Sequence, residues 1–383
     1  MASPHERLRR VVPVVALVLM LAGCSWPMFG GDPAHTHFSL DTKINVSNVS
    51  GLTQRWATPT EGHVYSSPAV VNGVVYVGSL DGKVYALDTT TGAVRWSAGI
   101  GYEVLSSPAV VNGIVYAATY NESISDGAIF ALDAATGATR WSVTNAGRIM
   151  SSPTVVDGVV YIGSLDAGVY ALDAATGAQR WFAHVQVATS VPAVVNGIVY
   201  IGAHFEGKLY ALDAATGATR WTGTTFGGSV DTSPAVVGGT AFVAAGDGCV
   251  WAFNAVTGAV QWFKQIGAGG SSPAVVNGAV YVGSQVRGVY ALDARTGAIQ
   301  WQTDTSTSFV NVDSSPTVAN GVVYAGTGDG KVFASDAATG ANLWETTTTA
   351  GANVVSSPTV VNGVVYIGSG DYKVYAFELP SKA

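Results

Sequence analysis

The sequence predicts an all-β fold, an eight-bladed β-propeller whose blades are four-stranded antiparallel sheets. Three features repeat along the chain. The phrase SSP or a close variant returns eight times at intervals of 39 to 45 residues, a turn dipeptide follows each copy, and the pattern A-x-D-x-x-T-G-x-x-x-W comes later in the repeat. Residues 131–141 and 211–221 are the same eleven letters, ALDAATGATRW. A fixed period of this length indicates an array of similar structural units.

Each repeat contains the signals of four short strands. A first apolar run ends at a dipeptide that suits a two-residue hairpin turn, in which both residues need a positive φ. These dipeptides are Asn72-Gly73, Asn112-Gly113, Asp157-Gly158, Asn196-Gly197, Gly238-Gly239, Asn277-Gly278, Asn320-Gly321 and Asn362-Gly363. Runs such as 74–79 and 83–87 are apolar at successive positions, which indicates strands buried on both faces. A two-sheet sandwich is the structural alternative, but it gives no reason for a repeat of this regularity.

The tryptophans predict how the ring closes. One ends the fourth strand of every repeat except the last, which stops at VYAFELPSKA, and LTQRWA near the start supplies the missing strand. We therefore expect the N-terminal segment to complete the last blade and remove the free edges of an open array. The expected docking tryptophans are Trp56, Trp96, Trp141, Trp181, Trp221, Trp262, Trp301 and Trp344.

The first residues predict export. Arg7, Arg9 and Arg10 precede an apolar run that is too short to span a bilayer. Leu21-Ala22-Gly23-Cys24 resembles a bacterial lipobox, which implies cleavage before Cys24 and a lipid on its sulfur. An ordinary secretory signal is the alternative, and it also implies export. We expect residues 1–23 to be a lipoprotein signal peptide, 24–50 a lipid-anchored tether and lead-in, and 51–380 the propeller.

The composition and the absence of known motifs argue against several classes of protein. A net charge of −7 argues against nucleic-acid binding. With Cys24 lipidated, Cys249 is the remaining cysteine, so no disulfide framework is expected. His35 and His37 precede the expected propeller, and no sequence pattern predicts a metal site. The sequence contains no G-x-S-x-G elbow and no P-loop, and we predict no catalytic residues.

The repeated motif is interpreted as structural. Its aspartate can accept hydrogen bonds from turn amides, its glycine suits a left-handed turn position, and its tryptophan can fill the space between blades. Six aspartates hold the same place and are expected to hold the same turn: Asp88, Asp133, Asp173, Asp213, Asp293 and Asp336.

This motif resembles the tryptophan-docking motif of quinoprotein-type propellers, the pyrroloquinoline quinone (PQQ) repeat family. The lead-in SWPMFGGDPAHT is similar to the W-P-x-x-x-x-D segment ahead of the first blade in such proteins. In size, anchor and repeat the chain resembles the eight-bladed lipoproteins of the outer-membrane β-barrel assembly machinery. The resemblance implies the fold and leaves the partner open.

The variable connections predict where a ligand would bind. The two tight turns of each repeat are nearly identical, whereas the second connection and the blade-to-blade connection differ between repeats and share the opposite face. Tyr65, Met150, Asp231 and Asp313 directly precede the repeated phrase and are expected at the channel mouth. Other polar or aromatic members of that face include Glu61, His63, Glu103, Arg148, His184, His204, Glu206, Asp247, Lys264 and Tyr372.

These observations are consistent with two alternative functions. The first is an exported, monomeric, non-catalytic module on the extracytoplasmic side of the membrane, held only by its lipid, that binds proteins or cell-envelope ligands. It needs no cofactor. The second is a PQQ-dependent dehydrogenase, for which the resemblance implies a vicinal cysteine pair, a calcium or lanthanide ion, a catalytic aspartate and long insertions. The sequence has no such pair and near-minimal repeats, so PQQ with Ca²⁺ is expected only under this alternative.

Overall fold

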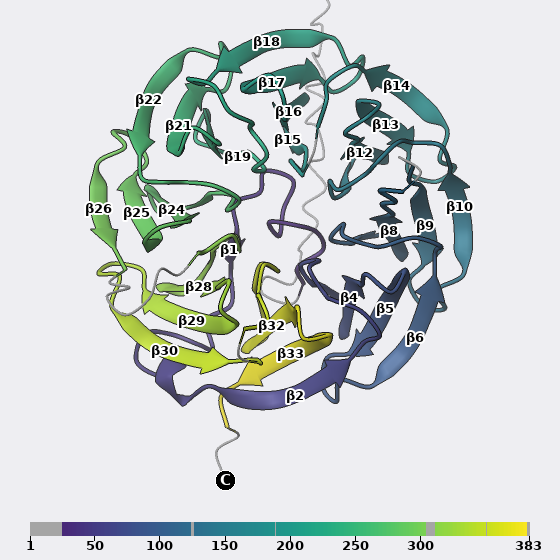
Figure 1. The fold of residues 1–383 in the computed structure, drawn as a ribbon. Coiled ribbons are helices and arrows are strands. Elements are labelled where there is room, and N and C mark those ends of the chain that lie inside the picture. The colour runs from purple at the N-terminus through teal and green to yellow at the C-terminus, as the bar shows by residue number, and fades with distance from the viewer. Residues whose placement is uncertain (1–24, 124–125, 188, 304–310, 350, 381–383) are drawn as a thin grey trace, which may run out of the picture.

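The computed structural model describes residues 25–123, 126–187, 189–303, 311–349 and 351–380. Eight antiparallel blades surround a central channel, which confirms the predicted propeller (Figure 1). In every blade the sheet order places four strands side by side as a meander, from the channel to the rim. One blade carries a short additional strand on its inner edge, β1 (Phe38–Ser39).

The inner half of each blade consists of a three-residue strand and its hairpin partner. The innermost strands are β3 (Ala69–Val71), β7 (Ala109–Val111), β11 (Thr154–Val156), β15 (Ala193–Val195), β19 (Ala235–Val237), β23 (Ala274–Val276), β27 (Thr317–Ala319) and β31 (Thr359–Val361). The second strands are β4 (Val74–Gly78), β8 (Ile114–Ala118), β12 (Val159–Gly163), β16 (Ile198–Ala203), β20 (Thr240–Ala244), β24 (Ala279–Ser284), β28 (Val322–Gly326) and β32 (Val364–Ser369).

The outer half carries the repeated motif. The third strands are β5 (Lys83–Asp88), β9 (Ile129–Asp133), β13 (Val169–Asp173), β17 (Lys208–Asp213), β21 (Cys249–Asn254), β25 (Gly288–Asp293), β29 (Lys331–Asp336) and β33 (Lys373–Glu378). The outermost strands are β6 (Val94–Gly99), β10 (Thr139–Val143), β14 (Gln179–Ala183), β18 (Thr219–Thr224), β22 (Val260–Gln265), β26 (Ile299–Gln302), β30 (Asn342–Thr347) and β2 (Thr53–Pro59). A 3₁₀ turn, η1 (Val49–Gly51), precedes β2.

The last of these strands closes the ring as predicted. β2 pairs antiparallel with β33, with Thr53 opposite Glu378 and Trp56 opposite Ala376. The chain therefore contributes its first long strand to its last blade, and the two ends of the array are joined by backbone hydrogen bonds.

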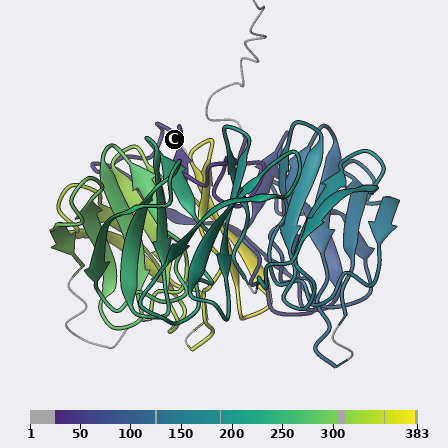
Figure 2. The same ribbon diagram turned by 90° about the horizontal axis from the view of Figure 1, so that it is seen from above.

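The disc has two distinct faces, which Figure 2 shows edge-on. The amide of Thr89, in the turn after β5, donates to Gly73 O in the turn after β3, and Ala134 and Gly113 do the same in the next blade. The two tight turns of each blade therefore share one side, which we call the turn face. The second connections and the blade-to-blade connections meet on the other side, the loop face; Leu80 N, for example, donates to His63 O.

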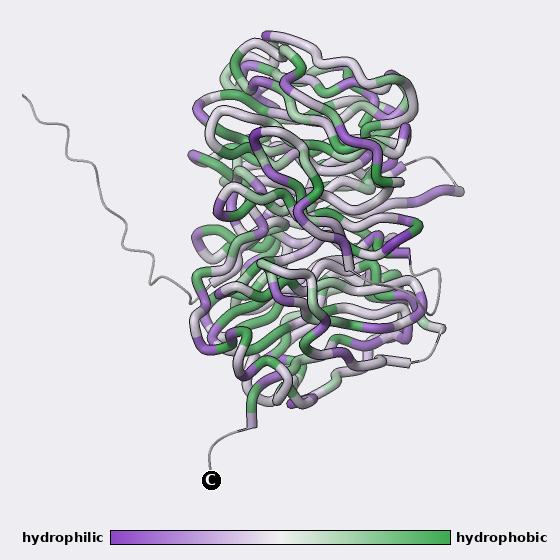
Figure 3. The backbone as a smooth tube through the Cα atoms, turned by 90° about the vertical axis from the view of Figure 1, so that its left-hand side faces the viewer, coloured by the Kyte–Doolittle hydropathy of each residue, from purple (hydrophilic) through white to green (hydrophobic). Residues whose placement is uncertain are grey.

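Apolar packing between blades forms the core, because the second and third strands are buried on both faces. Figure 3 shows hydrophobic residues, in green, distributed through the body of the disc. Tyr76 and Ala86 of the first blade, for example, pack with Val110, Val115 and Leu132 of the second.

Each docking tryptophan locks one blade to the next. Its indole N–H donates to the carbonyl of the residue after the motif aspartate or its equivalent in the neighbouring blade, at 2.8 to 3.1 Å. Trp96, for instance, bonds to Ala134 O, and the hydroxyl of Tyr76 donates to the same carbonyl at 3.1 Å. Trp344 instead bonds to Leu52 O, because the closing segment occupies that place.

The serines of the SSP phrase form a second set of hydrogen bonds that hold the ring together. The sequence showed that the phrase is repeated but not what it does. The first serine bonds within its own blade, where Gly78 N donates to Ser66 Oγ at 2.7 Å. In three repeats its hydroxyl also donates to the next blade, as from Ser151 Oγ to Ser190 O at 2.8 Å. The second serine joins neighbouring blades: Ser67 N donates to Ser107 Oγ at 2.8 Å. The inter-blade bonds continue round the ring and return from Ser357 N to Ser67 Oγ. The series lacks one hydroxyl, because Val191 holds the place of the second serine in the fourth repeat.

Alanine substitutions at two glycines distinguish two contributions to the free energy of unfolding. One is the strain of a Cβ at a positive φ, and the other is a clash with the docking tryptophan. Gly217 and Gly197 have φ values of +74° and +72°, but a Cβ on Gly217 would lie 2.6 Å from the ring of Trp181, whereas a Cβ on Gly197 would meet nothing within 4 Å. We expect Gly217→Ala to lower the free energy of unfolding by about 2–4 kcal/mol and Gly197→Ala by about 1 kcal/mol. Urea unfolding measures both, and equal losses would show that the indole does not pack on the turn.

Candidate binding site

The N-terminal lead-in lies inside the channel (Figure 1). Residues 26–39, which we call the plug, run round the inner wall and contact the innermost strands in turn. Trp26 and Val70 exchange backbone hydrogen bonds of 2.6 and 2.7 Å. Further amides donate to plug carbonyls: Val110 N to Pro27 O, Val194 N to Pro33 O, Val236 N to Ala34 O, Val275 N to Thr36 O and Val318 N to His37 O. The hydroxyl of Ser39 completes the circuit by donating to Val360 O at 2.7 Å.

The contacts of the plug show what the residues of the W-P-x-x-x-x-D segment do. Trp26 and Pro27 supply the first contacts with blades, and the carboxylate of Asp32 accepts hydrogen bonds from Ala34 N, at 2.8 Å, and from the hydroxyl of Thr36. Residues that the sequence pattern assigned to a tether ahead of the propeller therefore lie inside the ring. Their contacts reach partners as far as 321 positions away in the chain, which no local pattern reveals.

His35 and His37 are part of the plug, not of a segment ahead of the fold. Both side chains are fully buried, and the ring of Phe29 meets each edge-on at 5.6 and 4.9 Å between centroids. His35 Nδ1 lies 3.2 Å from Pro234 O, whereas neither nitrogen of His37 has a hydrogen-bond partner among the described residues. Desolvation lowers the pKa of His35 to about 4 and that of His37 to about 3, so both are neutral at pH 7.

The four predicted ligand residues stand at the loop-face end of the channel. Tyr65, Met150, Asp231 and Asp313 each precede the first serine or threonine of the inter-blade phrase, and all are partly exposed. Equivalent positions in the other four blades hold Leu105, Thr189, Gly270 and Val355. Their place in the repeat puts all eight at one level, which we call the mouth. Whether a ligand contacts them stays a prediction.

The mouth carries an aromatic side chain at the first blade and carboxylates at the fifth and seventh blades. Tyr65 stacks on His63 at 5.2 Å with an interplanar angle of 6°. Asp231 Oδ1 lies 2.7 Å from His204 Nδ1, and Asp313 Oδ2 accepts from Asn311 Nδ2 at 2.7 Å. The eight mouth positions hold two carboxylates and no lysine or arginine, so the local charge disfavours an anionic ligand.

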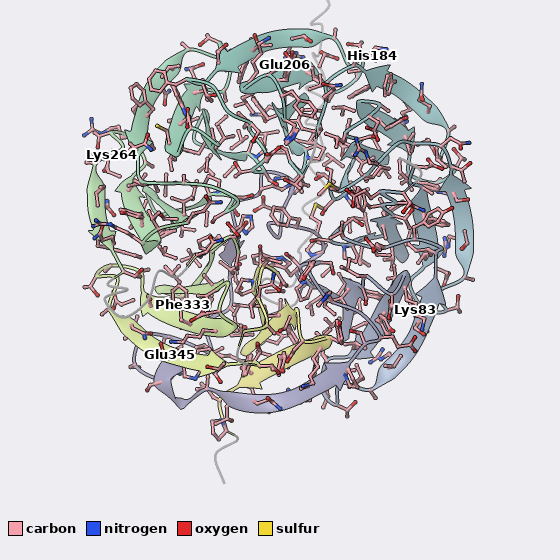
Figure 4. The ribbon with its side chains drawn as sticks, in the orientation of Figure 1. Lys83, His184, Glu206, Lys264, Phe333 and Glu345 are labelled. Atoms are coloured by element: carbon pink, nitrogen blue, oxygen red, sulfur yellow. The ribbon has the colours of Figure 1, made fainter. Side chains whose placement is uncertain are left out.

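Several other loop-face acids support the fold. Asp81, Glu206, Asp247 and Asp371 each accept a hydrogen bond from the aromatic side chain four residues later. The acid-x-x-x-aromatic spacing is visible in the sequence and could have identified this role. His184, Glu206 and Lys264 lie toward the rim of the disc and away from the channel (Figure 4).

A polar cleft lies between the first two blades on the loop face. It has a volume of about 350 Å³, and its walls include Asp81, Tyr102, Glu103, Tyr120 and Glu122. Its second wall belongs to the long connection at 119–128, of which residues 124 and 125 lie outside the described part of the chain.

Cys249 is structural. The side chain is 2% exposed, and its thiol donates to Gln265 Oε1 at 2.9 Å. Burial, followed by the nearby Asp247 carboxylate, raises the pKa of the thiol to about 11, so the reactive thiolate is scarce at neutral pH. The described residues also contain no group of three or more His, Cys, Asp or Glu side chains placed to hold a metal ion.

Comparison with known proteins identifies the family. Residues 45–185, 165–285 and 265–381 match the family described as outer membrane protein assembly factor BamB, and the chain belongs to that family. BamB from Moraxella catarrhalis has a similar structure, with 22% identity and a TM-score of 0.73, over 85% of this chain and 99% of that one. A membrane-spanning helix of sufficient length and hydropathy is absent from the part of the chain described by the structure.

Quinoprotein dehydrogenases share the fold as well. The quinohemoprotein alcohol dehydrogenase of Comamonas testosteroni superposes with a TM-score of 0.76 and 20% identity, over 94% of this chain and 81% of that one. Its curated sequence is 38% identical over 66 residues, which are 17% of this chain and 9% of the relative. Lupanine 17-hydroxylase [cytochrome c] of Pseudomonas sp is 36% identical over 66 residues, again 17% of this chain, and 10% of its own length. The chain thus spans about a tenth of each curated relative that it matches.

The residues of the mouth do not fit PQQ. This cofactor is a quinone with three carboxylates, and a site for it needs cationic groups or a metal ion to balance their charge. The mouth presents Asp231 and Asp313 instead. The nearby cation Arg148 is already engaged by Asp166 through two hydrogen bonds of 2.7 Å.

The buried histidines predict sensitivity to acid. Their ordinary pKa is 6.5, and burial lowers it in the folded state, so protonation favours the unfolded chain. Their contribution is complete above pH 6.5 and is lost as the pH falls toward 4 for His35 and toward 3 for His37. We expect His37→Asn, which tolerates the positive φ of 53°, to lose less unfolding free energy between pH 7 and pH 4 than the unaltered protein. Urea unfolding at both pH values measures this, and an unchanged acid loss would contradict a buried neutral His37.

Proposed function

We propose that the protein is an exported, lipid-anchored, non-catalytic binding or scaffold module whose loop face receives a protein or cell-envelope ligand. The observation that supports this most is the plug. It occupies the channel with the chain's own residues, and the turn face is covered by nearly identical, mutually hydrogen-bonded turns. The loop face is where the repeats differ, and its mouth offers partly exposed polar and aromatic groups.

Membership of the BamB family favours a protein partner, because the family is named for the assembly of outer membrane proteins. The mouth chemistry is consistent with a neutral or basic segment of that partner. Tyr65 gives a flat surface for apolar or aromatic contact, and Asp231 and Asp313 give acceptors for a lysine or arginine.

Site-specific photo-cross-linking in cells tests the proposed face. A photoreactive residue at Tyr65 or Met150 should form protein cross-links, because both side chains are partly exposed at the mouth. The matched control is Thr90, an exposed turn-face residue, where we expect none. Cross-links to protein from Thr90 but not from the mouth would place the partner on the wrong face for this proposal.

The PQQ-dependent dehydrogenase is the second candidate, because quinoprotein enzymes are among the structural neighbours and curated relatives. Titration of the purified protein with PQQ and Ca²⁺, followed by quinone absorbance and dye-linked oxidation of alcohols or sugars, separates the two. The acidic mouth predicts neither saturable binding nor turnover. Stoichiometric binding with turnover would replace the scaffold proposal by the enzyme.

A further inference from the structure

The geometry of the plug points to an orientation at the membrane. We infer that the turn face lies against the lipid bilayer and that the loop face, with the mouth, is held away from it. This inference rests on the proposed lipid anchor at Cys24. It adds what the anchor alone does not determine, namely which side of the disc touches the membrane.

The orientation follows from the face through which the chain enters the ring. β3 runs from the loop face to the turn face, because the turn at Asn72-Gly73 follows it. Trp26 pairs with Val70 of this strand in the antiparallel sense, so the residue before Trp26 lies on the turn-face side of it. The chain therefore enters the channel through the turn face.

The connection between the anchor and the ring is too short to act as a tether. Ser25 is exposed, but Trp26 is 3% exposed, holds two backbone hydrogen bonds to Val70, and lies against the backbone of Gly31. Cys24 is two positions before Trp26, and two extended residues reach about 7 Å. A lipid on Cys24 would thus sit at the turn face, and the disc could turn over only by pulling Trp26 out of the channel.

The turn face carries side chains that suit contact with lipid. Leu40, Val46 and Val256 are 57%, 39% and 73% exposed. Leu40 follows β1, whose Ser39 is level with Ala319, so it lies beside the Asn320-Gly321 turn. Val46 lies beside that turn, because a Cβ on Gly321 would be 3.5 Å from its side chain, and Val256 lies within the turn between β21 and β22.

Charge on this face is largely balanced. In four successive blades the motif aspartate is paired with an arginine seven residues later, at 2.6 to 2.8 Å: Asp88–Arg95, Asp133–Arg140, Asp173–Arg180 and Asp213–Arg220. These pairs compensate carboxylates that would otherwise be repelled by anionic phospholipid headgroups.

Fluorescence quenching in vesicles tests the orientation. The lipidated protein, with Cys249→Ser as background, is labelled at Leu40→Cys or at Phe205→Cys, which lies on the loop face and is 68% exposed in the unaltered protein. In phospholipid vesicles that contain a headgroup nitroxide lipid, we expect quenching of the dye at position 40 to be several-fold stronger than at position 205. Equal quenching, or stronger quenching at 205, with the protein bound to the vesicles, would overturn the orientation and leave the anchor intact.

Two variants separate the anchor from the orientation. Cys24→Ala should release the protein from membranes, whereas Cys249→Ala should not; retention of Cys24→Ala would contradict the anchor and this inference with it.

Insertion of about 20 Gly and Ser residues between Ser25 and Trp26 gives a flexible connection of roughly 25 Å. We expect it to abolish most of the difference between positions 40 and 205. A difference that survives the insertion would show that the short connection does not set the orientation.

Discussion

The structure depends on how the inward edges of its innermost strands are satisfied. A propeller leaves one backbone edge of each blade facing the channel, and unpaired amides and carbonyls there are costly once buried. In this chain the plug supplies the partners, because carbonyls between Trp26 and His37 accept hydrogen bonds from the central valines of six innermost strands. The same segment that completes these hydrogen bonds also lies along the inner wall of the channel and sets the face through which the chain enters it.

Around this hub, two repeated locks give the ring its regularity. The indole of one blade bonds to the turn of the next, and the serine hydroxyls join neighbouring blades nearer the loop face. Both locks use residues that recur in the sequence, so they tolerate little variation and leave few positions free for ligand recognition. Variation is confined to the loop face, where several acids are again engaged with nearby aromatic side chains. At the mouth, Tyr65, Asp231 and Asp313 also have partners within the chain, but their side chains stay partly exposed.

The repeat made most of the fold predictable. Period, turn dipeptides and the count of tryptophans gave the number of blades and the closing strand, because each of these signals is local and occurs in every copy. The plug could not be predicted in this way. It occurs once and has no period, and its partners are dispersed over the whole chain, as the bond from Ser39 to Val360 shows. For the same reason the sequence placed His35 and His37 ahead of the propeller, although both are fully buried inside it. At the mouth, the repeat gave Tyr65, Met150, Asp231 and Asp313 equivalent positions, and their contact with a ligand stays a prediction. Nothing in the sequence indicated that His63 and His204 contact two of them.

Native-state hydrogen exchange of the full chain tests most directly whether the N-terminal segment is the hub of the ring. The amides of Val70, Val110, Val194, Val236, Val275 and Val318 all donate to plug carbonyls. If the plug is an integral part of the fold, these amides exchange only through global unfolding, with the same free energy as the amides of the second and third strands. Exchange of these six amides at the rate of surface loops, while the remaining strands stay protected, would show that the plug leaves the channel readily and would contradict its role as the hub of the ring.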